Sequence, residues 1–181
     1  MAGDNIPVTT FSRSWKTYQD RLSATVASLT AEQLALRAAP GLRSVGEIVL
    51  HIVGCRMFWL AGYLEEDGGD ALQPYARWNE AALQSPFPSW NDVALALEAA
   101  VPTPAELARG LDDTWRFLAE CLARWSPGDI RQTFPDVGDD GQPIEVSRAW
   151  VVWHILEHDL HHGGELSLTL GAHSIPAAFA V

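Results

Sequence analysis

An all-α fold, specifically a four-helix bundle with short extra helices and loops, is the architecture that this sequence of 181 residues predicts. Apolar residues recur at spacings of three and four over long stretches, as on the buried face of a helix. Capping-box patterns open several of these stretches, and proline or glycine ends them. The long stretches are joined by one or two long connections, which is typical of a bundle.

The first long helix is predicted by an apolar stripe comprising Phe11, Trp15, Tyr18, Leu22, Val26 and Leu29. Thr30-Ala31-Glu32-Gln33 then matches a capping box and predicts a short helical turn. Pro40-Gly41 breaks the chain after it.

The second long helix begins at the capping box Ser44-Val45-Gly46-Glu47 and continues to about Tyr63. It contains His51. Residues 65–88 hold two clusters rich in glycine or proline, Asp67-Gly68-Gly69-Asp70 and Pro86-Phe87-Pro88. We therefore expect a long connection with at most a short helix, crossing the end of the bundle.

A short helix is predicted over residues 89–100, before the third long helix. Thr103-Pro104-Ala105-Glu106 combines an N-cap, a first-turn proline and a capping-box glutamate, and opens that third helix. It is expected to run to about Trp125, where Ser126-Pro127-Gly128 stops it.

Residues 129–145 predict either a small hairpin or an irregular loop around Asp139-Asp140-Gly141-Gln142. Ser147 can cap the fourth long helix, which should end near Gly171.

Composition favours one domain over residues 1–181 with a sizeable core. Lys plus Arg number 12 against 23 Asp plus Glu, a net charge of −11, so a phosphate backbone is repelled and nucleic acid is not an expected partner. The first residues lack a basic segment followed by an apolar run, and no stretch approaches the ~20 apolar residues of a membrane span. We expect a cytoplasmic protein without a membrane partner.

Histidine is concentrated in one segment of the fourth predicted helix. Four of the six histidines lie there, namely His154, His158, His161 and His162. Residues three and four apart on a helix share one face, so these rings can point into one sector. Imidazole is a ligand for zinc, nickel, copper and iron, which makes the segment a candidate half of a metal site.

His51 is the natural third ligand because it is the remaining histidine inside a predicted helix. Taken alone it would be interpreted as a core histidine bonded to a backbone carbonyl, but the cluster reverses that preference. Three protein ligands leave a position open, as in catalytic zinc sites. Cys55, one turn further on, is expected to be a buried apolar residue. His173 is expected to be solvated.

Two ligand pairs in the cluster have the same spacing, His154 with His158 and His158 with His162. Apolar residues surround this helix, so periodicity does not decide between the pairs. The segment 154–158 also satisfies H-x-x-E-H, the inverted zinc-protease signature. We reject that interpretation because little more than the end of the helix follows, and we expect Glu157 at the surface or behind a metal ligand.

The segments Glu47-Ile48-Val49-Leu50-His51-Ile52-Val53 and His158-Asp159-Leu160-His161-His162-Gly163-Gly164-Glu165 resemble the DinB/YfiT-like superfamily of metalloenzymes. The resemblance covers essentially the whole chain. It implies a four-helix bundle, often a homodimer, in which His51, His158 and His162 hold a divalent metal. His154 and His161 would be neighbours of the site.

The commonest ending of the second family segment is H-H-R-G-Q, and here Gly163 and Glu165 replace the arginine and the glutamine. If that arginine anchors an anionic substrate or fixes the bundle, this chain must do so otherwise. The substrate class is therefore not carried over.

Relatives implied by the resemblance include bacillithiol transferases, mycothiol-dependent maleylpyruvate isomerase and a domain of ergothioneine-synthesising enzymes. It thus implies a metal-dependent transferase or isomerase that uses a low-molecular-weight thiol, a small-molecule substrate and zinc or nickel. No catalytic residue is assigned. One alternative is a non-catalytic metal-binding or stress-related dimeric bundle; another is a bundle without metal, whose histidines only form hydrogen bonds at a dimer interface.

Overall fold

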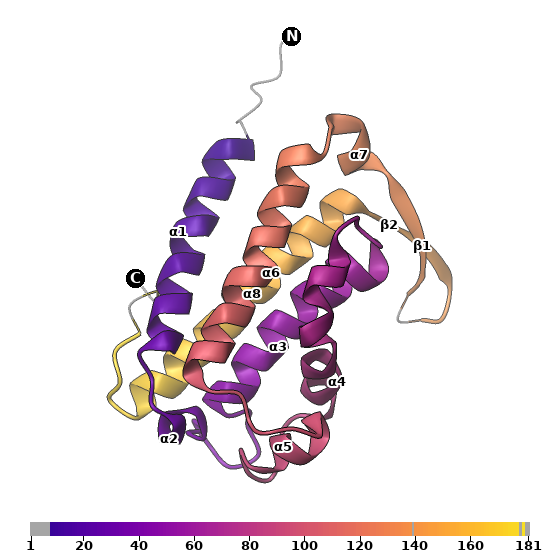
Figure 1. Ribbon diagram of the computed structural model, residues 1–181. Coiled ribbons are helices and arrows are strands. Elements are labelled where there is room, and N and C mark those ends of the chain that lie inside the picture. Colours follow the sequence, from indigo (N-terminus) through magenta and orange to yellow (C-terminus); the bar gives the residue numbers. More distant parts are fainter. Residues whose placement is uncertain (1–7, 139, 178, 180–181) are drawn as a thin grey trace.

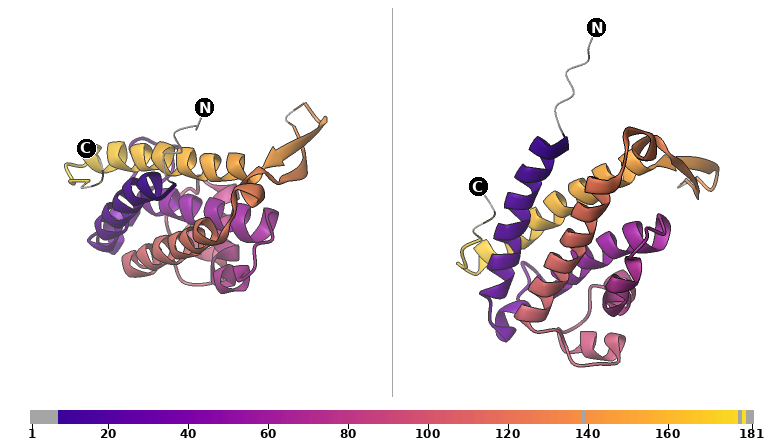
Figure 2. Two further views of the ribbon diagram at one scale, coloured as in Figure 1. Left: turned by 90° about the horizontal axis from the view of Figure 1, so that it is seen from above. Right: turned by 45° about the horizontal axis from the view of Figure 1, so that its top comes forward.

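Four long helices form a bundle in the computed structural model, which describes residues 8–138, 140–177 and 179 (Figure 1). They are α1 (Val8–Ala27), α3 (Val45–Met57), α6 (Pro104–Arg124) and α8 (Arg148–Ala172). Helix α3 packs against both α6 and α8, and α1 packs against α6. Seen from above in Figure 2, α8 runs along one side of the other three. The predicted fold class is confirmed.

Four predicted caps each begin a helix. The side chains of Ser44 and Thr103 each accept a hydrogen bond from the backbone three residues on, and the glutamate there bonds back to the cap. Thr30 and Gln33 form the same reciprocal pair of hydrogen bonds at the start of the short helix α2 (Ala31–Leu34). The Ser147 side chain accepts a hydrogen bond from the Trp150 backbone N–H at the start of α8. Each cap satisfies donors that the first turn leaves free.

A π-helical segment, η1 (Phe58–Tyr63), extends α3 to the predicted end. The apolar span Val45–Tyr63 has a mean hydropathy of 1.4, which is enough to cross a membrane by length and composition. This span is longer and more apolar than we expected of any segment from the sequence. However, 67% of it is buried inside the bundle, as in the core helix of a bundle. The expectation about a leader rests on residues outside the described range.

The connection over residues 65–88 contains more helix than predicted. It folds into the 3₁₀ helix η2 (Gly69–Tyr75) and the α-helix α4 (Ala76–Gln84). Helix α4 lies against the side of α3 instead of crossing the end of the bundle (Figure 1). Gly54 permits this approach, since a Cβ there would meet the Asn79 backbone at 2.8 Å. The short helix expected next is α5 (Asp92–Leu97).

A β-hairpin precedes α8, which decides between the two predicted alternatives. Its antiparallel strands β1 (Thr133–Val137) and β2 (Pro143–Ser147) project from the N-terminal end of α8 (Figures 1 and 2). The turn residue Asp139 lies outside the described residues. The segment predicted to stop α6 also starts another helix, α7 (Pro127–Arg131), because Ser126 caps it.

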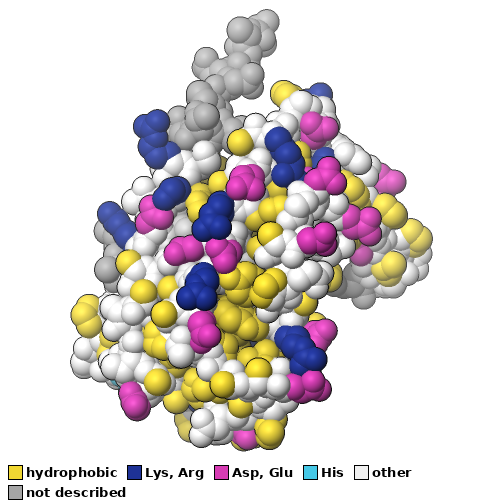
Figure 3. Space-filling model, viewed as in Figure 1, with side chains coloured by type: hydrophobic (Ala, Val, Ile, Leu, Met, Phe, Trp, Pro, Cys, Tyr) yellow, Lys and Arg dark blue, Asp and Glu magenta, His cyan; other side chains and the backbone are white. Residues whose placement is uncertain are grey.

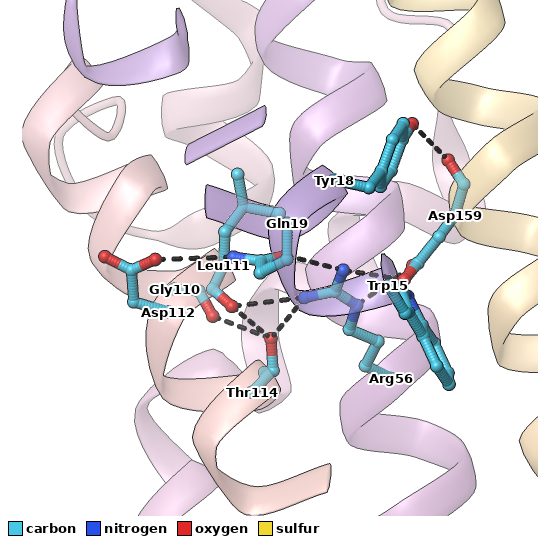
Figure 4. A network of polar contacts seen from close by, with 9 residues as sticks. All are labelled: Trp15, Tyr18, Gln19, Arg56, Gly110, Leu111, Asp112, Thr114 and Asp159. Atoms are coloured by element: carbon cyan, nitrogen blue, oxygen red, sulfur yellow. Dashed lines mark hydrogen bonds and ion pairs between the residues drawn. The ribbon is translucent and has the colours of Figure 1, made fainter. Parts of the chain in front are cut away.

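A fully buried ion pair joins α3 to α8 (Figure 4). Arg56 Nε and Nη2 lie 2.9 and 2.7 Å from the two carboxylate oxygens of Asp159. Trp15 Nε1–H donates to the same carboxylate at 2.9 Å. Arg56 also donates to Gln19 Oε1 at 2.8 Å and to the Leu111 carbonyl at 3.1 Å. The network connects all four long helices and was not anticipated from the sequence.

Tyr18 of α1 lies against α8 at Gly163. A Cβ at this position would lie 1.6 Å from the Tyr18 hydroxyl oxygen, which donates to the Asp159 carbonyl at 3.0 Å. At the next residue, Gly164, an added Cβ would meet nothing within 4 Å. The two adjacent glycines therefore differ in their tolerance of a side chain.

We expect Gly163→Ala to lower the free energy of unfolding by about 1–3 kcal/mol, because the methyl group displaces Tyr18 from its hydrogen bond. Gly164→Ala is the matched control and should stabilise the exposed helix position by up to about 1 kcal/mol. Urea unfolding of the two variants measures the difference. If Tyr18 is the obstacle, Tyr18→Phe should reduce the effect of Gly163→Ala; equal effects at both glycines would contradict the described contact.

Candidate metal centre

Helices α3 and α8 bring three histidine rings together. One ring nitrogen from each of His51, His158 and His162 lies within 4.8 Å of the other two. His51 Nε2 and His158 Nε2 are 3.1 Å apart. Within the part of the chain that the structure describes, this is the one group of three histidine, cysteine or acidic side chains with metal-ligand spacing. The three residues are those implied by the family resemblance.

His154, the other candidate partner of His158, lies outside this group. Its ring stacks on Trp150 at a centroid distance of 4.9 Å and an interplanar angle of 5°. The centroids of His154 and His158 are 6.0 Å apart, whereas those of His158 and His162 are 4.3 Å apart. The geometry thus assembles the second of the two ligand pairs that the sequence left open.

The environment of the site keeps the imidazoles of His51 and His158 uncharged. Burial, with the positive field of Arg43 and neighbouring histidines, lowers the pKa of His51 to about 4. Burial and the adjacent His162 lower the pKa of His158 to about 2. Both rings are then neutral at pH 7 and present lone pairs. His158 Nδ1 is buried without a hydrogen-bond partner among the described residues. Converging neutral imidazoles fit a divalent transition metal.

Glu165 acts on the third ring of the group. Its Oε2 lies 2.8 Å from His162 Nδ1, and this hydrogen bond lowers the pKa of the carboxyl group. With Nδ1 occupied, Nε2 is the His162 nitrogen left for a metal, the arrangement in which a carboxylate orients a ligating histidine. Glu165 is one of the two departures from the family pattern, and the sequence alone assigned it no role.

The remaining predicted residues are not members of the three-histidine group. The side chain of Glu157 is 46% exposed and its carboxylate is 3.7 Å from His154 Nδ1, so it is a surface group. His161 is exposed. Cys55 is buried, as expected, and burial raises the pKa of its thiol to about 12, so it is not a thiolate at neutral pH. His173 is exposed, but its Nε2 also bonds to the Arg37 carbonyl at 2.9 Å.

Aromatic residues flank the histidines toward the start of α8. Trp59, on η1, has ring centroids 5.5 Å from Trp150 and 5.3 Å from His154. We call these three residues the aromatic wall. Trp15 is enclosed in the core, at 3% exposure, whereas Trp59 is only partly buried. Trp59 instead borders the histidine group through His154.

Two hollows elsewhere on the surface are not lined by histidine. A cavity of about 630 Å³ lies between α1 and α6, and its lining includes Lys16, Asp20 and Trp115. Another, of about 500 Å³, is lined by residues that include Tyr75 and Trp78. Neither lining contains a histidine. The face in Figure 3 shows both charge signs mixed with apolar side chains and hardly any histidine surface.

A family model described as the DinB superfamily matches residues 14–166. No curated protein sequence is significantly similar to the chain. Among solved structures, a DinB-like protein from Bacillus cereus is 16% identical with a TM-score of 0.56, over 91% of each chain. A conserved protein from Enterococcus faecalis is also 16% identical, with a TM-score of 0.63 over 92% of this chain and 99% of that one. At this identity the two structures show a shared fold.

Proposed function

Because the chain belongs to the DinB superfamily, we propose that it binds one divalent transition metal through His51, His158 and His162. The observation that carries the proposal is the convergence of three ring nitrogens within 4.8 Å of one another. Zinc and nickel are the metals proposed, because both accept neutral imidazole ligands. Glu165 would hold the His162 ring in its ligating orientation.

We further propose that the centre serves a transferase or isomerase that uses a low-molecular-weight thiol of the mycothiol or bacillithiol type. A three-histidine set leaves room for an exogenous ligand. When bound, the metal supplies Lewis acidity that lowers the pKa of a thiol or water entering the open position. The chain supplies no thiolate of its own there, since Cys55 is buried and protonated. The aromatic wall offers ring faces to the apolar part of a small molecule.

In a transfer of this kind, the thiol sulfur forms a bond to an electrophilic carbon of the substrate. The bond from that carbon to the leaving group breaks, the leaving group departs with the electron pair, and the thiol proton passes to solvent. In an isomerisation the thiol adds and is later expelled, so that it is regenerated. Neither reaction needs an external oxidant or reductant.

The test begins with elemental analysis of protein purified without an affinity tag. We expect one equivalent of a transition metal, which a chelator removes and zinc or nickel restores. The reloaded and the stripped protein are then assayed with low-molecular-weight thiols and electrophiles, and thiol consumption is expected only with metal. Protein that binds neither metal would overturn the proposed centre. Metal binding without turnover would favour the non-catalytic alternative.

A further inference from the structure

Arg43 differs from the other arginines that are at least half-buried in the described part of the chain. Arg37, Arg56 and Arg148 each form an ion pair with a buried carboxylate at 2.7–2.8 Å. Arg43 forms no ion pair or hydrogen bond with a described residue, and its Nε atom is buried without a partner. An unpaired buried donor on a permanently charged group is unfavourable unless something outside the chain binds it.

The fold places Arg43 beside the histidine group. Arg43 directly precedes Ser44, the cap of α3, and His51 lies two turns further along that helix. Arg37 pairs with Ser44 in an isolated β-bridge, and the Arg37 carbonyl accepts a hydrogen bond from His173 at the end of α8. The loop that carries Arg43 is thus held against the C-terminal part of α8, which contains Glu165.

Electrostatic effects agree with this placement. The pKa of His51 is lowered first by burial and then by the positive charge of Arg43. The pKa of Glu165 is lowered first by its bond to His162, and Arg43 contributes in the same direction. Moreover, three buried side-chain atoms lack a partner among the described residues, and two of them belong to Arg43 and His158. Arg43 and one of the three histidines of the candidate centre thus each have a buried polar atom that no described residue satisfies.

Charge also favours an anionic ligand here. The chain as a whole carries −11, which repels anions in general. Near the three histidine rings, the positive charge of Arg43 and the negative charge of Glu165 offset each other. A bound divalent metal would therefore give the site a net positive charge. A guanidinium group matches the geometry of a carboxylate, to which it can donate two parallel hydrogen bonds.

We propose that Arg43 binds a carboxylate of the small molecule that reacts at the metal centre, so that the site selects carboxylate-bearing thiols or electrophiles. This inference rests on the proposed metal centre and names the substrate class that it accepts. The aromatic wall and Arg43 lie on opposite sides of the three histidine rings. The aromatic wall lies toward the start of α8, and Arg43 lies toward the end of α8. A ligand with an apolar part and a carboxylate would match both.

The experiment compares two thiols of similar size on the cobalt(II)-loaded protein. One is 3-mercaptopropionate and the other is 3-mercaptopropan-1-ol, which lacks the carboxylate; the thiolate–cobalt absorption band reports binding. We expect the wild type to bind the carboxylate at least about tenfold more tightly. Arg43→Gln should remove that preference, weakening only the carboxylate, and Arg43→Lys should retain part of it. Arg21→Gln, at an exposed arginine on α1, is the matched control and should behave as wild type.

The outcomes separate this inference from the proposed function. Failure of the wild type to bind cobalt would overturn the metal centre itself. If cobalt and both thiols bind but the wild type shows no preference, or Arg43→Gln keeps it, the role of Arg43 is overturned and the metal centre stands. Cobalt content and circular dichroism are measured for every variant. Arg43→Met, which retains an apolar stem, provides a second neutral substitution if Arg43→Gln does not fold.

Discussion

Replacing His158 by alanine is expected to lower the affinity of the protein for zinc or nickel by at least about 100-fold. Removal of an outer partner of a metal ligand typically costs 10–100-fold, and loss of a ligand should cost at least as much. The three rings form a nearly equilateral group, with centroid distances of 4.6 Å between His51 and His158, 4.5 Å between His51 and His162, and 4.3 Å between His158 and His162. Competition titration with a metal indicator measures the change. The same loss is expected for His51→Ala and His162→Ala.

Two neighbouring histidines on α8 provide matched controls. His161 is exposed, and His154 is stacked on Trp150, so neither should change the metal affinity appreciably when replaced by alanine. Together the substitutions distinguish the two ligand pairs of equal spacing. Loss of binding in His154→Ala with retention in His162→Ala would show that the wrong pair has been assigned.

Asp159→Ala is expected to lower the free energy of unfolding by about 3–5 kcal/mol, because it leaves the Arg56 guanidinium buried without its counter-ion. Both side chains of this pair have 0% exposure, so solvent cannot take the place of the carboxylate. For a chain of this size the change corresponds to a fall in Tm of roughly 6–20 °C. Thermal and urea unfolding of the metal-free protein measure it without interference from the metal.

A double substitution and a surface control test this explanation. Arg56→Leu with Asp159→Leu removes both charges and should cost less than Asp159→Ala alone, because no unpaired charge is left. Asp20→Ala removes an exposed carboxylate from its pair with Lys16 and should leave unfolding almost unchanged. A small effect of Asp159→Ala, similar to that of Asp20→Ala, would mean that the buried pair does not hold α3 to α8.

Local signals in the sequence predicted the long helices well. Ser44, Thr103 and Ser147 cap helices where their side-chain oxygens satisfy free backbone donors, and these interactions need only nearby residues. Helix α4 was underestimated because the glycine and proline clusters mark only the ends of its segment. Its packing depends on Gly54 of α3, a residue more than twenty positions away from it.

The candidate site was predicted less completely, because its geometry depends on contacts between helices. The histidine cluster was visible as a local pattern, but the choice of His162 over His154 depends on how α8 is rotated against α3. Arg56 and Asp159 are separated by 103 positions, so their pairing leaves no local pattern. A charged residue in an otherwise apolar stripe was the one available signal for each. No pattern in the sequence marked Arg43, because the feature that distinguishes it is a buried Nε atom without a hydrogen-bond partner among the described residues.

The close contact between Tyr18 and position 163 also limits how this sequence can evolve. The family resemblance places an arginine at 163, where the Tyr18 hydroxyl oxygen lies 1.6 Å from the site of a Cβ. An arginine at 163 and this position of the tyrosine ring exclude each other. An arginine at 163 would therefore require another placement of the Tyr18 ring or another residue at position 18. Which side chains are tolerated at position 163 therefore depends on the residue at position 18.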